Sequence, residues 1–412
     1  MKHFPLVVAT LLMPTAATLG QATPVQPSGG AAAAAAMSAV VTRSNPRIRD
    51  VQLEVNLYAT PPVGEPAERD GGQVPFLNPY SITQARLCMP VLTRTTWTDT
   101  DFTKSTATIF VNSFPQKVDP ATVFSTKAGT RQANAVFNLT PGNCNDIRLQ
   151  VTYQVQQWDL AVDEGAAAGI TWPREWPAEV QSYLGAELGV RPDDPLIKSL
   201  AEGATRGGPR SVTPFVAAKH AVTAICARYK SINQSTSEYG PAQSLRGIYF
   251  SPTNAGIATG RATAVEFTAD CVAALRAIGI PARIVYGITL QDPRADGRDK
   301  RDNARFRFIG EFWLPEAGWI PFDPVRMKGQ GAASRVTDAP IKGFANLDDL
   351  NGFIPLAYAA VPEGYQKADR YAIWGWNLVS GNVTEDYAAS RIRLELTSRG
   401  NGKVPKMPAP LD

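Results

Sequence analysis

Hydrophobic and polar residues alternate in the first part of the chain. From residue 51 to residue 57 every second residue is Val or Leu, with Gln, Glu and Asn between them. The same period recurs over residues 147–155, and shorter apolar runs occupy 107–111 and 135–139 between Pro, Asn and Gly turns. A period of two places successive side chains on opposite faces of a strand. Residues 47–160 are therefore predicted to form an antiparallel β-sandwich domain.

Helical spacing replaces this alternation in the middle of the chain. Residues 193–203 suit a short helix with a proline in its first turn, and residues 214–230 carry apolar side chains at intervals of three and four. Thr213 precedes the second of these helices and suits its N-cap. A third apolar stripe follows residues 264–278 and ends at Gly279, which predicts a helix terminus there.

Further strands are predicted towards the C-terminus. Apolar or alternating runs occupy residues 283–290, 306–312, 319–322, 371–376 and 392–396. The chain is therefore expected to contain a second, mixed region of helices and strands after the β domain.

The N-terminus has the parts of a secretory signal peptide. A charged start, an apolar run and a small-residue zone occupy residues 1–22, and residues 23–46 are rich in Ala, Gly and Ser, which suits a flexible linker. We therefore expect a secreted or periplasmic protein. No later run reaches the ~20 apolar residues that a membrane-spanning helix needs, so no transmembrane segment is predicted.

The composition is that of a water-soluble protein of two or three domains. Of the 412 residues, 44% are hydrophobic and 19% are charged, and the net charge is +4 with both signs interspersed. This charge is too small to predict binding to nucleic acid. His, Cys and Asp do not cluster with the spacing of metal ligands, so neither a metal nor a cofactor is expected.

Export permits disulfide bonds between the four cysteines. Cys88 and Cys144 lie in the predicted β domain, whereas Cys226 and Cys271 lie on predicted helices. Pairing within each region predicts the disulfides Cys88–Cys144 and Cys226–Cys271. Four cysteines allow three connectivities, and four buried thiols are the alternative.

Two segments of the chain carry a family resemblance. Residues 260–283 read GRATAVEFTADCVAALRAIGIPAR, and residues 307–324 read RFIGEFWLPEAGWIPFDP. They resemble the nucleophile-bearing helix and the His-x-Trp-x-Glu … Gly-Trp-x-Pro-x-Asp-Pro segment of transglutaminase-like proteins. By this resemblance Ala264 stands at the position of the catalytic cysteine, Arg307 at that of the histidine and Asp323 at that of the aspartate.

The resemblance also implies the fold class. It implies an α+β protein whose transglutaminase-like core, with helices packed on an antiparallel β-sheet, occupies residues 165–345 after the β-sandwich domain. Residues 346–412 are expected to supply strands that complete this core, followed by a loose tail.

The chemistry of the family resembled needs groups that this sequence lacks. There a thiolate at a helix N-terminus attacks an amide carbonyl, a histidine takes the thiol proton and an aspartate orients the histidine. Ala264 offers no nucleophile, and the guanidinium of Arg307 stays protonated near neutral pH. Cys271 lies two turns along the helix on its core-facing stripe, and His220 is interpreted as a surface side chain. The inherited mechanism is therefore expected to be lost.

Carboxylates and aromatic residues near these positions allow other interpretations. The candidates for a cleft are Glu266, Glu311, Trp313 and Trp319, together with the aspartate of the second segment. The carboxylates could support acid–base hydrolysis if their environments separate their pKa values. Asp323 could instead form a charge-assisted ion pair with Arg307, and the tryptophans could pack in the core rather than line a cleft.

Three hypotheses about function follow from the sequence. The first is an exported, non-catalytic transglutaminase-like protein, a pseudoenzyme that acts as a binding or scaffold module for a peptide, a protein or a cell-surface polymer. The alternative is a divergent amide hydrolase, or a transglutaminase- or protease-like enzyme, that uses cleft carboxylates. The third is a purely structural module whose cleft is closed by side chains. Fold alone does not choose between them.

Overall fold

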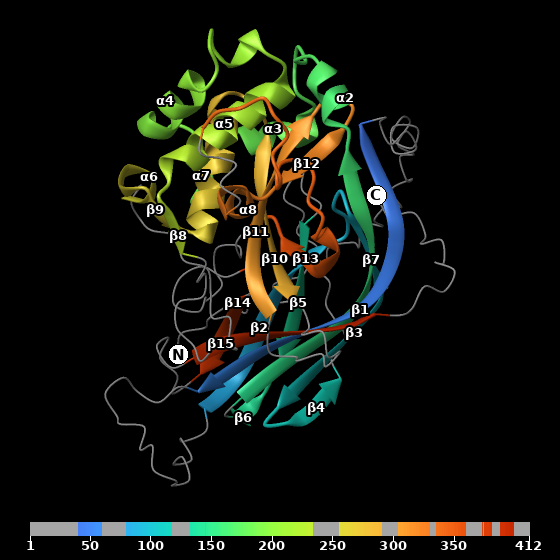
Figure 1. Cartoon of the computed structure of the whole chain (residues 1–412). Helices are drawn as coiled ribbons and strands as arrows, with labels where there is room; N and C mark the ends of the chain where they lie inside the picture. Colours follow the sequence, from blue (N-terminus) through green and yellow to red (C-terminus); the bar gives the residue numbers. More distant parts are fainter. Residues whose placement is uncertain are drawn as a thin grey trace, which may run out of the picture. The chain divides into compact units, whose positions relative to one another are not determined.

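Antiparallel sheets form most of the described fold, and a group of helices packs on one of them (Figure 1). The computed structural model describes residues 40–59, 80–117, 132–144, 146–233, 255–290, 304–329, 335–359, 373, 375–380 and 388–398. All of these belong to one compact unit, Ser38–Asp412. The predicted signal peptide and the last residues of the predicted tail lie outside the described residues.

Two antiparallel sheets form the N-terminal β-rich region. One has the strand order β15-β1-β7-β3-β4, and the other has the order β14-β2-β5, with β6 also paired to β2. The strands are β1 (Val41–Ala59), β2 (Tyr80–Leu92), β3 (Thr98–Val111), β4 (Phe114–Lys117), β5 (Gln132–Leu139), β6 (Gly142–Cys144), β7 (Asp146–Val162), β14 (Gly375–Ser380) and β15 (Ala388–Ser398).

The alternation of apolar residues accounts for these strands. Val51, Leu53 and Val55 of β1 are buried, and Leu53 lies opposite Val151 of β7 in the antiparallel register. Opposed apolar side chains on one sheet face stabilise the pairing and fix its register, because a slip by one residue would turn them to the other face. The strands predicted within residues 47–160 are confirmed.

The predicted linker, residues 23–46, is wrong at its C-terminal end. Strand β1 already begins at Val41, which lies opposite Val162 of β7. The Asn45–Pro46 pair does not end the strand, because a register shift between Ser44 and Arg47 accommodates it and Asn45 adopts a positive φ of 48°. Residues 23–39 lie outside the described part of the chain.

Helices dominate the region after β7. They are α2 (Glu164–Gly169), α3 (Ala178–Gln181), α4 (Pro195–Gly203), α5 (Pro214–Arg228), α6 (Ala255–Thr259), α7 (Ala264–Ala277) and α8 (Pro324–Gly329), with short 3-10 turns η1 (Ser182–Leu184), η2 (Pro209–Ser211) and η3 (Leu350–Gly352). The three longer predicted helices are confirmed as α4, α5 and α7. Thr213 precedes α5 as predicted, but its side chain makes no capping hydrogen bond.

Helix α7 is the central helix of this region, and its ends follow from the sequence. Thr263 and Glu266 form a reciprocal capping box at its start. Gly279 follows its C-terminus with a φ of +81°, a conformation that glycine adopts without steric cost. In Figure 1 the helix lies between α5 and the strands β10 and β11, and most of its residues are buried.

A four-stranded antiparallel sheet supports these helices. Its strand order is β12-β11-β10-β13, and its strands are β10 (Ala282–Leu290), β11 (Ala304–Leu314), β12 (Gly318–Phe322) and β13 (Phe353–Ala357). Gly310 of β11 permits close packing, because a Cβ there would lie 2.1 Å from a ring carbon of Phe322. A two-stranded parallel ribbon, β8 (Ser231–Asn233) and β9 (Arg261–Thr263), leads into α7.

The C-terminal strands do not all join this sheet, contrary to the expectation for residues 346–412. Strand β13 pairs with β10, but β14 pairs with β2 and β15 pairs with β1. The C-terminal segment therefore returns to the N-terminal sheets, and β15 covers the edge of β1 that β7 leaves open. The strand predicted over residues 371–376 lies later, at 375–380.

Candidate active-site remnant

Ala264 occupies the first position of α7. Ala264 is 7% exposed, and its side chain is a methyl group. The helix start is closed by its own cap: the Glu266 carboxylate accepts a hydrogen bond of 2.9 Å from the backbone N–H of Thr263, and the Glu266 N–H donates to the Thr263 hydroxyl at 3.3 Å. Glu266, a cleft candidate from the sequence, therefore stabilises the helix terminus.

Arg307 and Asp323 are in direct contact. Arg307 on β11 donates from Nε to Asp323 Oδ2 at 2.9 Å, and its Nη2 lies 2.8 Å from the same oxygen. Both side chains are mostly buried, and the Arg307 guanidinium also lies 5.5 Å from the ring centre of Phe353. The ion pair that the sequence suggested is present.

The second oxygen of Asp323 is also engaged. Asp323 Oδ1 accepts a hydrogen bond of 2.9 Å from the backbone N–H of Arg326, and the Asp323 carbonyl accepts one from Met327 N–H. These contacts make Asp323 the N-cap of α8. Among the described residues, no thiol or imidazole is hydrogen-bonded to Asp323. Its carboxylate oxygens are instead bonded to the guanidinium of Arg307 and to the backbone N–H of Arg326 at the start of α8.

Arg307 has a second carboxylate partner that the sequence did not reveal. Its Nη2 lies 3.0 Å from Asp349 Oδ1, and Asp349 also contacts Arg326 Nη1 at 2.8 Å. Burial lowers the pKa of Arg307, but the negative charges of Asp323 and Asp349 outweigh burial, so the pKa lies above its ordinary value. The guanidinium is therefore a fixed cation and cannot accept a proton.

Glu311 is fully buried and paired with an arginine. Arg283 on β10 donates from Nε to Glu311 Oε2 at 2.7 Å, and the hydroxyl of Thr96 reaches Oε1 at 3.4 Å. Burial raises the pKa of Glu311 above its ordinary value, and Arg283 and Thr96 offset only part of that shift. Glu311 therefore has a fixed ion-pair partner inside the protein.

The two predicted cleft tryptophans pack against each other, and Trp319 also packs against Arg283. Trp313 of β11 lies opposite Trp319 of β12, with ring centres 5.4 Å apart in an edge-to-face arrangement. The Arg283 guanidinium stacks between Trp319, at 3.9 Å, and Tyr358, at 3.6 Å. Both tryptophans are partly buried, and their contacts are those of an inter-strand aromatic cluster.

The predicted disulfide Cys88–Cys144 is wrong. Cys144 of β6 lies opposite Tyr80 of β2, whereas Cys88 lies opposite Val136 of β5. The two cysteines are thus offset by eight positions along β2, roughly 25 Å of strand, and a disulfide tolerates about 7 Å between Cα atoms. Sharing a domain did not bring them together.

Cys226 and Cys271 are neighbours, as the other predicted pair requires. They lie on α5 and α7, both are fully buried, and the structure holds them as thiols. Burial raises the pKa of Cys271, and its hydrogen bond with Cys226 adds to that shift. A buried thiol with a raised pKa is a poor nucleophile, which disfavours Cys271 as a catalytic group.

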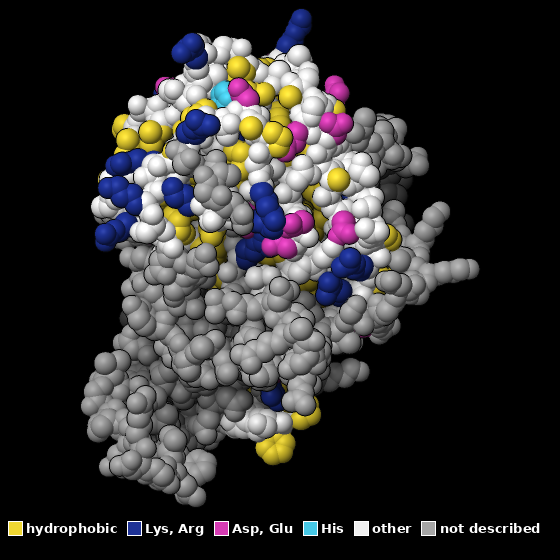
Figure 2. Space-filling model, viewed as in Figure 1, with side chains coloured by type: hydrophobic (Ala, Val, Ile, Leu, Met, Phe, Trp, Pro, Cys, Tyr) yellow, Lys and Arg dark blue, Asp and Glu magenta, His cyan; other side chains and the backbone are white. Residues whose placement is uncertain are grey.

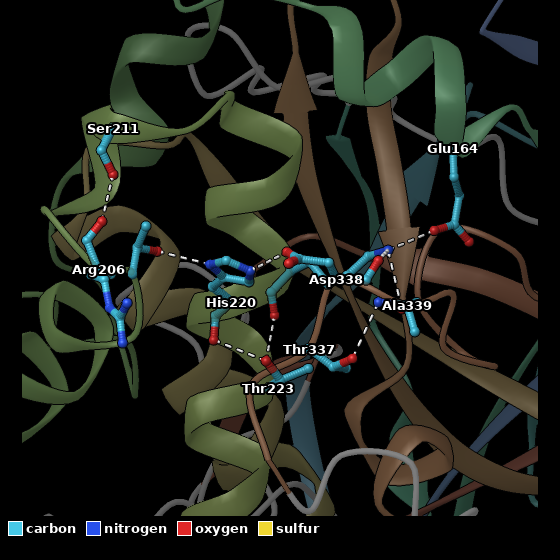
Figure 3. Close-up of polar contacts among 10 residues, drawn as sticks. Glu164, Arg206, Ser211, His220, Thr223, Thr337, Asp338 and Ala339 are labelled. Atoms are coloured by element: carbon cyan, nitrogen blue, oxygen red, sulfur yellow. Dashed lines mark hydrogen bonds and ion pairs between the residues drawn. The ribbon is translucent and has the colours of Figure 1, made fainter.

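His220 is not the surface side chain that the sequence suggested. Its side chain is 12% exposed, and the ring lies between Thr205, 3.1 Å from Nδ1, and Asp338, 2.6 Å from Nε2 (Figure 3). The adjacent Lys219 donates to Glu164 at 2.7 Å and to the carbonyls of Asp338 and Ala339. The cluster anchors the segment after α8 to α5, and His220 is engaged away from Asp323.

The comparisons with known proteins agree with the fold. Residues 206–324 match the family model of the transglutaminase-like superfamily. The chain carries a transglutaminase-like domain. Its fold is similar to that of a candidate cysteine protease from Cytophaga hutchinsonii, with 15% identity and a TM-score of 0.51 over 90% of this chain and 96% of that one. At this identity the likeness shows the fold alone.

Other comparisons add less. The periplasmic domain of TgpA from Pseudomonas aeruginosa aligns with 72% of this chain and 96% of its own length, but the identity is 13% and the TM-score is 0.28, which is too low to carry an argument. The sequence matches none of the curated proteins.

The transglutaminase-like domain contains a titratable pair that the sequence analysis missed. Tyr229, at the end of α5, donates its hydroxyl to Asp270 of α7. Burial raises the pKa of Asp270 to about 7, and Glu266 and Asp194 add to the shift while the Tyr229 hydroxyl opposes it. The sequence signal was a carboxylate one turn beyond Glu266 on a mostly apolar helix.

The surface of the transglutaminase-like domain has an uneven charge. Lys and Arg side chains gather over the flank formed by α4, α6 and β9, whereas Asp and Glu lie mainly elsewhere on the viewed face (Figure 2). Within the described ranges, His, Cys, Asp and Glu do not form a group of three or more that could hold a metal ion. None of the helices in the described part of the chain has the length and apolar character needed to span a membrane.

Proposed function

We propose that this chain is an exported, non-catalytic transglutaminase-like protein that binds a peptide, a protein or a cell-surface polymer. The observation that carries the proposal is the pairing of Arg307 with Asp323, with Ala264 at the start of α7. A nucleophile and a general base are missing from the positions where the family has them. In a serine protease, loss of such groups lowers the rate by about 10⁶-fold.

The carboxylates of the region support the same proposal. Glu266 caps α7, Glu311 is buried against Arg283, and Asp323 caps α8 while it pairs with Arg307. A general acid or base needs a position within reach of a substrate proton and a pKa near the working pH. Each of these three carboxylates has instead a fixed structural partner, which disfavours the alternative of a hydrolase that uses cleft carboxylates.

A protein without catalysis can still bind a ligand, and the charged groups at Arg307, Asp323 and Asp349 could take part in such binding. The guanidinium is partly accessible, and its second partner, Asp349, is half exposed. A partly accessible arginine with an exposed counter-ion is a chemical feature that suits recognition of a ligand. A purely structural module would not need it.

The proposal is tested by measuring binding and turnover in the same sample. The purified chain is dialysed against labelled peptides and cell-wall polymer fragments, and the recovered ligand is analysed by mass spectrometry. Retention of chemically intact ligand supports the proposal. Recovery of cleaved, deamidated or amine-linked ligand contradicts it, and a bell-shaped pH–rate profile insensitive to thiol alkylation would identify the carboxylate hydrolase instead.

A further inference from the structure

Two arginines beside the degenerate site are covered by two adjacent aspartates of one loop. Arg307 and Arg326 both contact Asp349 Oδ1, at 3.0 and 2.8 Å. Arg326 Nη2 also contacts Asp348 Oδ1, and Lys342 lies 3.3 Å from Asp348 Oδ2. Counting these groups with Asp323, three cations face three carboxylates.

The two sides of this cluster differ in burial. The side chains of Arg307 and Arg326 are 13% and 18% exposed, whereas those of Asp348 and Asp349 are 64% and 50% exposed. Arg307 keeps one buried partner, Asp323, whatever the loop does. Ion pairs with an exposed partner contribute little to stability, so the loop aspartates are exchangeable while the arginines are fixed.

The loop is held in place by contacts that do not involve its two aspartate side chains. Asn346, just before them, exchanges two hydrogen bonds with the backbone of Val162, at 2.8 and 3.1 Å. Leu347 and Leu350 on either side of the aspartates are buried. The segment is therefore anchored on both sides of a two-residue polar stretch.

We infer that Arg307 and Arg326 form a binding site for an acidic peptide segment, and that Asp348 and Asp349 occupy this site as a built-in competitor. This inference rests on the proposed binding function and names its ligand class. Two carboxylates on consecutive residues of a turn are what the arginines already hold, so a peptide whose adjacent acidic residues adopt such a turn reproduces their contacts. Planar guanidinium groups suit carboxylates in this way.

The competitor lowers the apparent affinity for any peptide in trans. A peptide must displace Asp348 and Asp349, which are present at high effective concentration because they belong to the same chain. The apparent affinity is the affinity of the open site multiplied by the fraction of molecules in which the site is open. Replacing Asp348 and Asp349 by neutral residues should therefore increase the affinity for an acidic peptide. If the salt bridges served only to stabilise the fold, the same replacement would not increase this affinity.

The test compares binding of the acetylated and amidated hexapeptide Asn-Leu-Asp-Asp-Leu-Asn, the sequence of residues 346–351, to three proteins. They are the full chain, its Asp348→Asn/Asp349→Asn variant and a charge-matched control, Asp193→Asn/Glu202→Gln, altered at exposed residues of the α4 region. We expect the loop variant to bind at least tenfold more tightly than the full chain and the control, with an affinity that falls as salt rises. Adding Arg326→Gln to the loop variant should abolish the gain.

Several results would overturn the inference. They are equal peptide affinity in the three proteins, equal binding of a peptide with Asn in place of both Asp residues, or tighter binding of inorganic phosphate than of the peptide. The single variant Asp349→Asn, which keeps the Asp348 contacts, serves if the double variant unfolds, and it should give a smaller gain in affinity. Amide turnover by the full chain would refute the proposed function, whereas a missing gain in affinity without turnover refutes only this inference.

Discussion

At the residue scale, the account depends on what replaces the reacting groups of the family. A methyl group at Ala264 cannot attack a carbonyl, and the guanidinium of Arg307 cannot take a proton. Asp323, the aspartate of the resemblance, is held by Arg307 and by the N–H of Arg326. In this structure the carboxylate neutralises the mostly buried guanidinium of Arg307 and caps α8.

The first prediction restores the two missing groups. In Ala264→Cys/Arg307→His, the thiol would lie at the start of α7 and the imidazole beside Asp323. A neighbouring imidazolium and a helix N-terminus lower a thiol pKa, so we expect alkylation by iodoacetamide at pH 7 to be roughly tenfold faster than in Ala264→Cys alone. The single variant is the control, because it carries the same thiol without the imidazole. Equal rates would mean that the surrounding contacts have also diverged.

At the scale of elements, helix α7 carries the first of the two motif segments and packs against α5 and the strands β10 and β11. Its end was predicted from Gly279, whereas the capping box of Thr263 and Glu266 at its start was recognised only in the structure. The contacts that α7 makes with neighbouring elements could not be predicted from the sequence. The hydrogen bond between Tyr229 and Asp270 joins two helices, and sequence periodicity says only that both helices have an apolar stripe.

The second prediction concerns the pH dependence of stability. Because the pKa of Asp270 is raised to about 7 from an ordinary 3.8, the folded state binds a proton that the unfolded state releases between these values. The stability that this proton contributes is complete below the ordinary pKa and is lost as the pH rises through about 7. A shift of this size corresponds to at most roughly 4 kcal/mol.

Urea unfolding between pH 4.5 and 8.5 provides the measurement. The free energy of unfolding of the chain should fall over this range more steeply than that of Asp270→Asn, which keeps the hydrogen bond to Tyr229 but does not titrate. Parallel pH profiles for the two proteins would show that Asp270 has an ordinary pKa.

The third prediction concerns the Cys226–Cys271 pair, whose thiols are already in contact. Refolding in oxidised glutathione should join them, each sulfur losing its proton as glutathione is reduced. A disulfide that closes a loop of roughly 45 residues stabilises by about 4 kcal/mol in the chain-entropy model. Non-reducing peptide mass spectrometry should find the linked peptides, and Cys226→Ala provides the control. Two free thiols after oxidative refolding would contradict the prediction.

At the scale of the whole molecule, the N-terminal sheets and the transglutaminase-like region are joined by specific polar contacts. The hydroxyl of Thr96 donates to the carbonyl of Trp319 at 2.9 Å, and Gln157 donates to the carbonyl of Phe353 at 3.0 Å. The chain also passes back from the transglutaminase-like region to the N-terminal sheets, because β14 and β15 pair there. These contacts come from residues far apart in sequence.

The distance in sequence between contacting residues explains which parts of the fold the sequence could predict. The β-rich region and the individual helices and strands follow from periodicity, whereas the fold class and the helix–sheet core were implied by the resemblance of two segments to the transglutaminase-like family. The partners of β15, the position of His220 and the contact of Asp349 with Arg307 depend on long-range packing, which periodicity does not encode. The wrong Cys88–Cys144 pairing has the same cause, since sharing a domain does not fix the register of its strands.

The central claim is that the transglutaminase-like domain of this chain has no amide chemistry. The most direct measurement follows ammonia release and incorporation of a fluorescent primary amine into glutamine-containing proteins by the purified chain, with Asp323→Ala as the matched variant. We predict that both proteins remain at the level of buffer alone, with and without prior thiol alkylation. Turnover by the chain that disappears in Asp323→Ala would contradict the account.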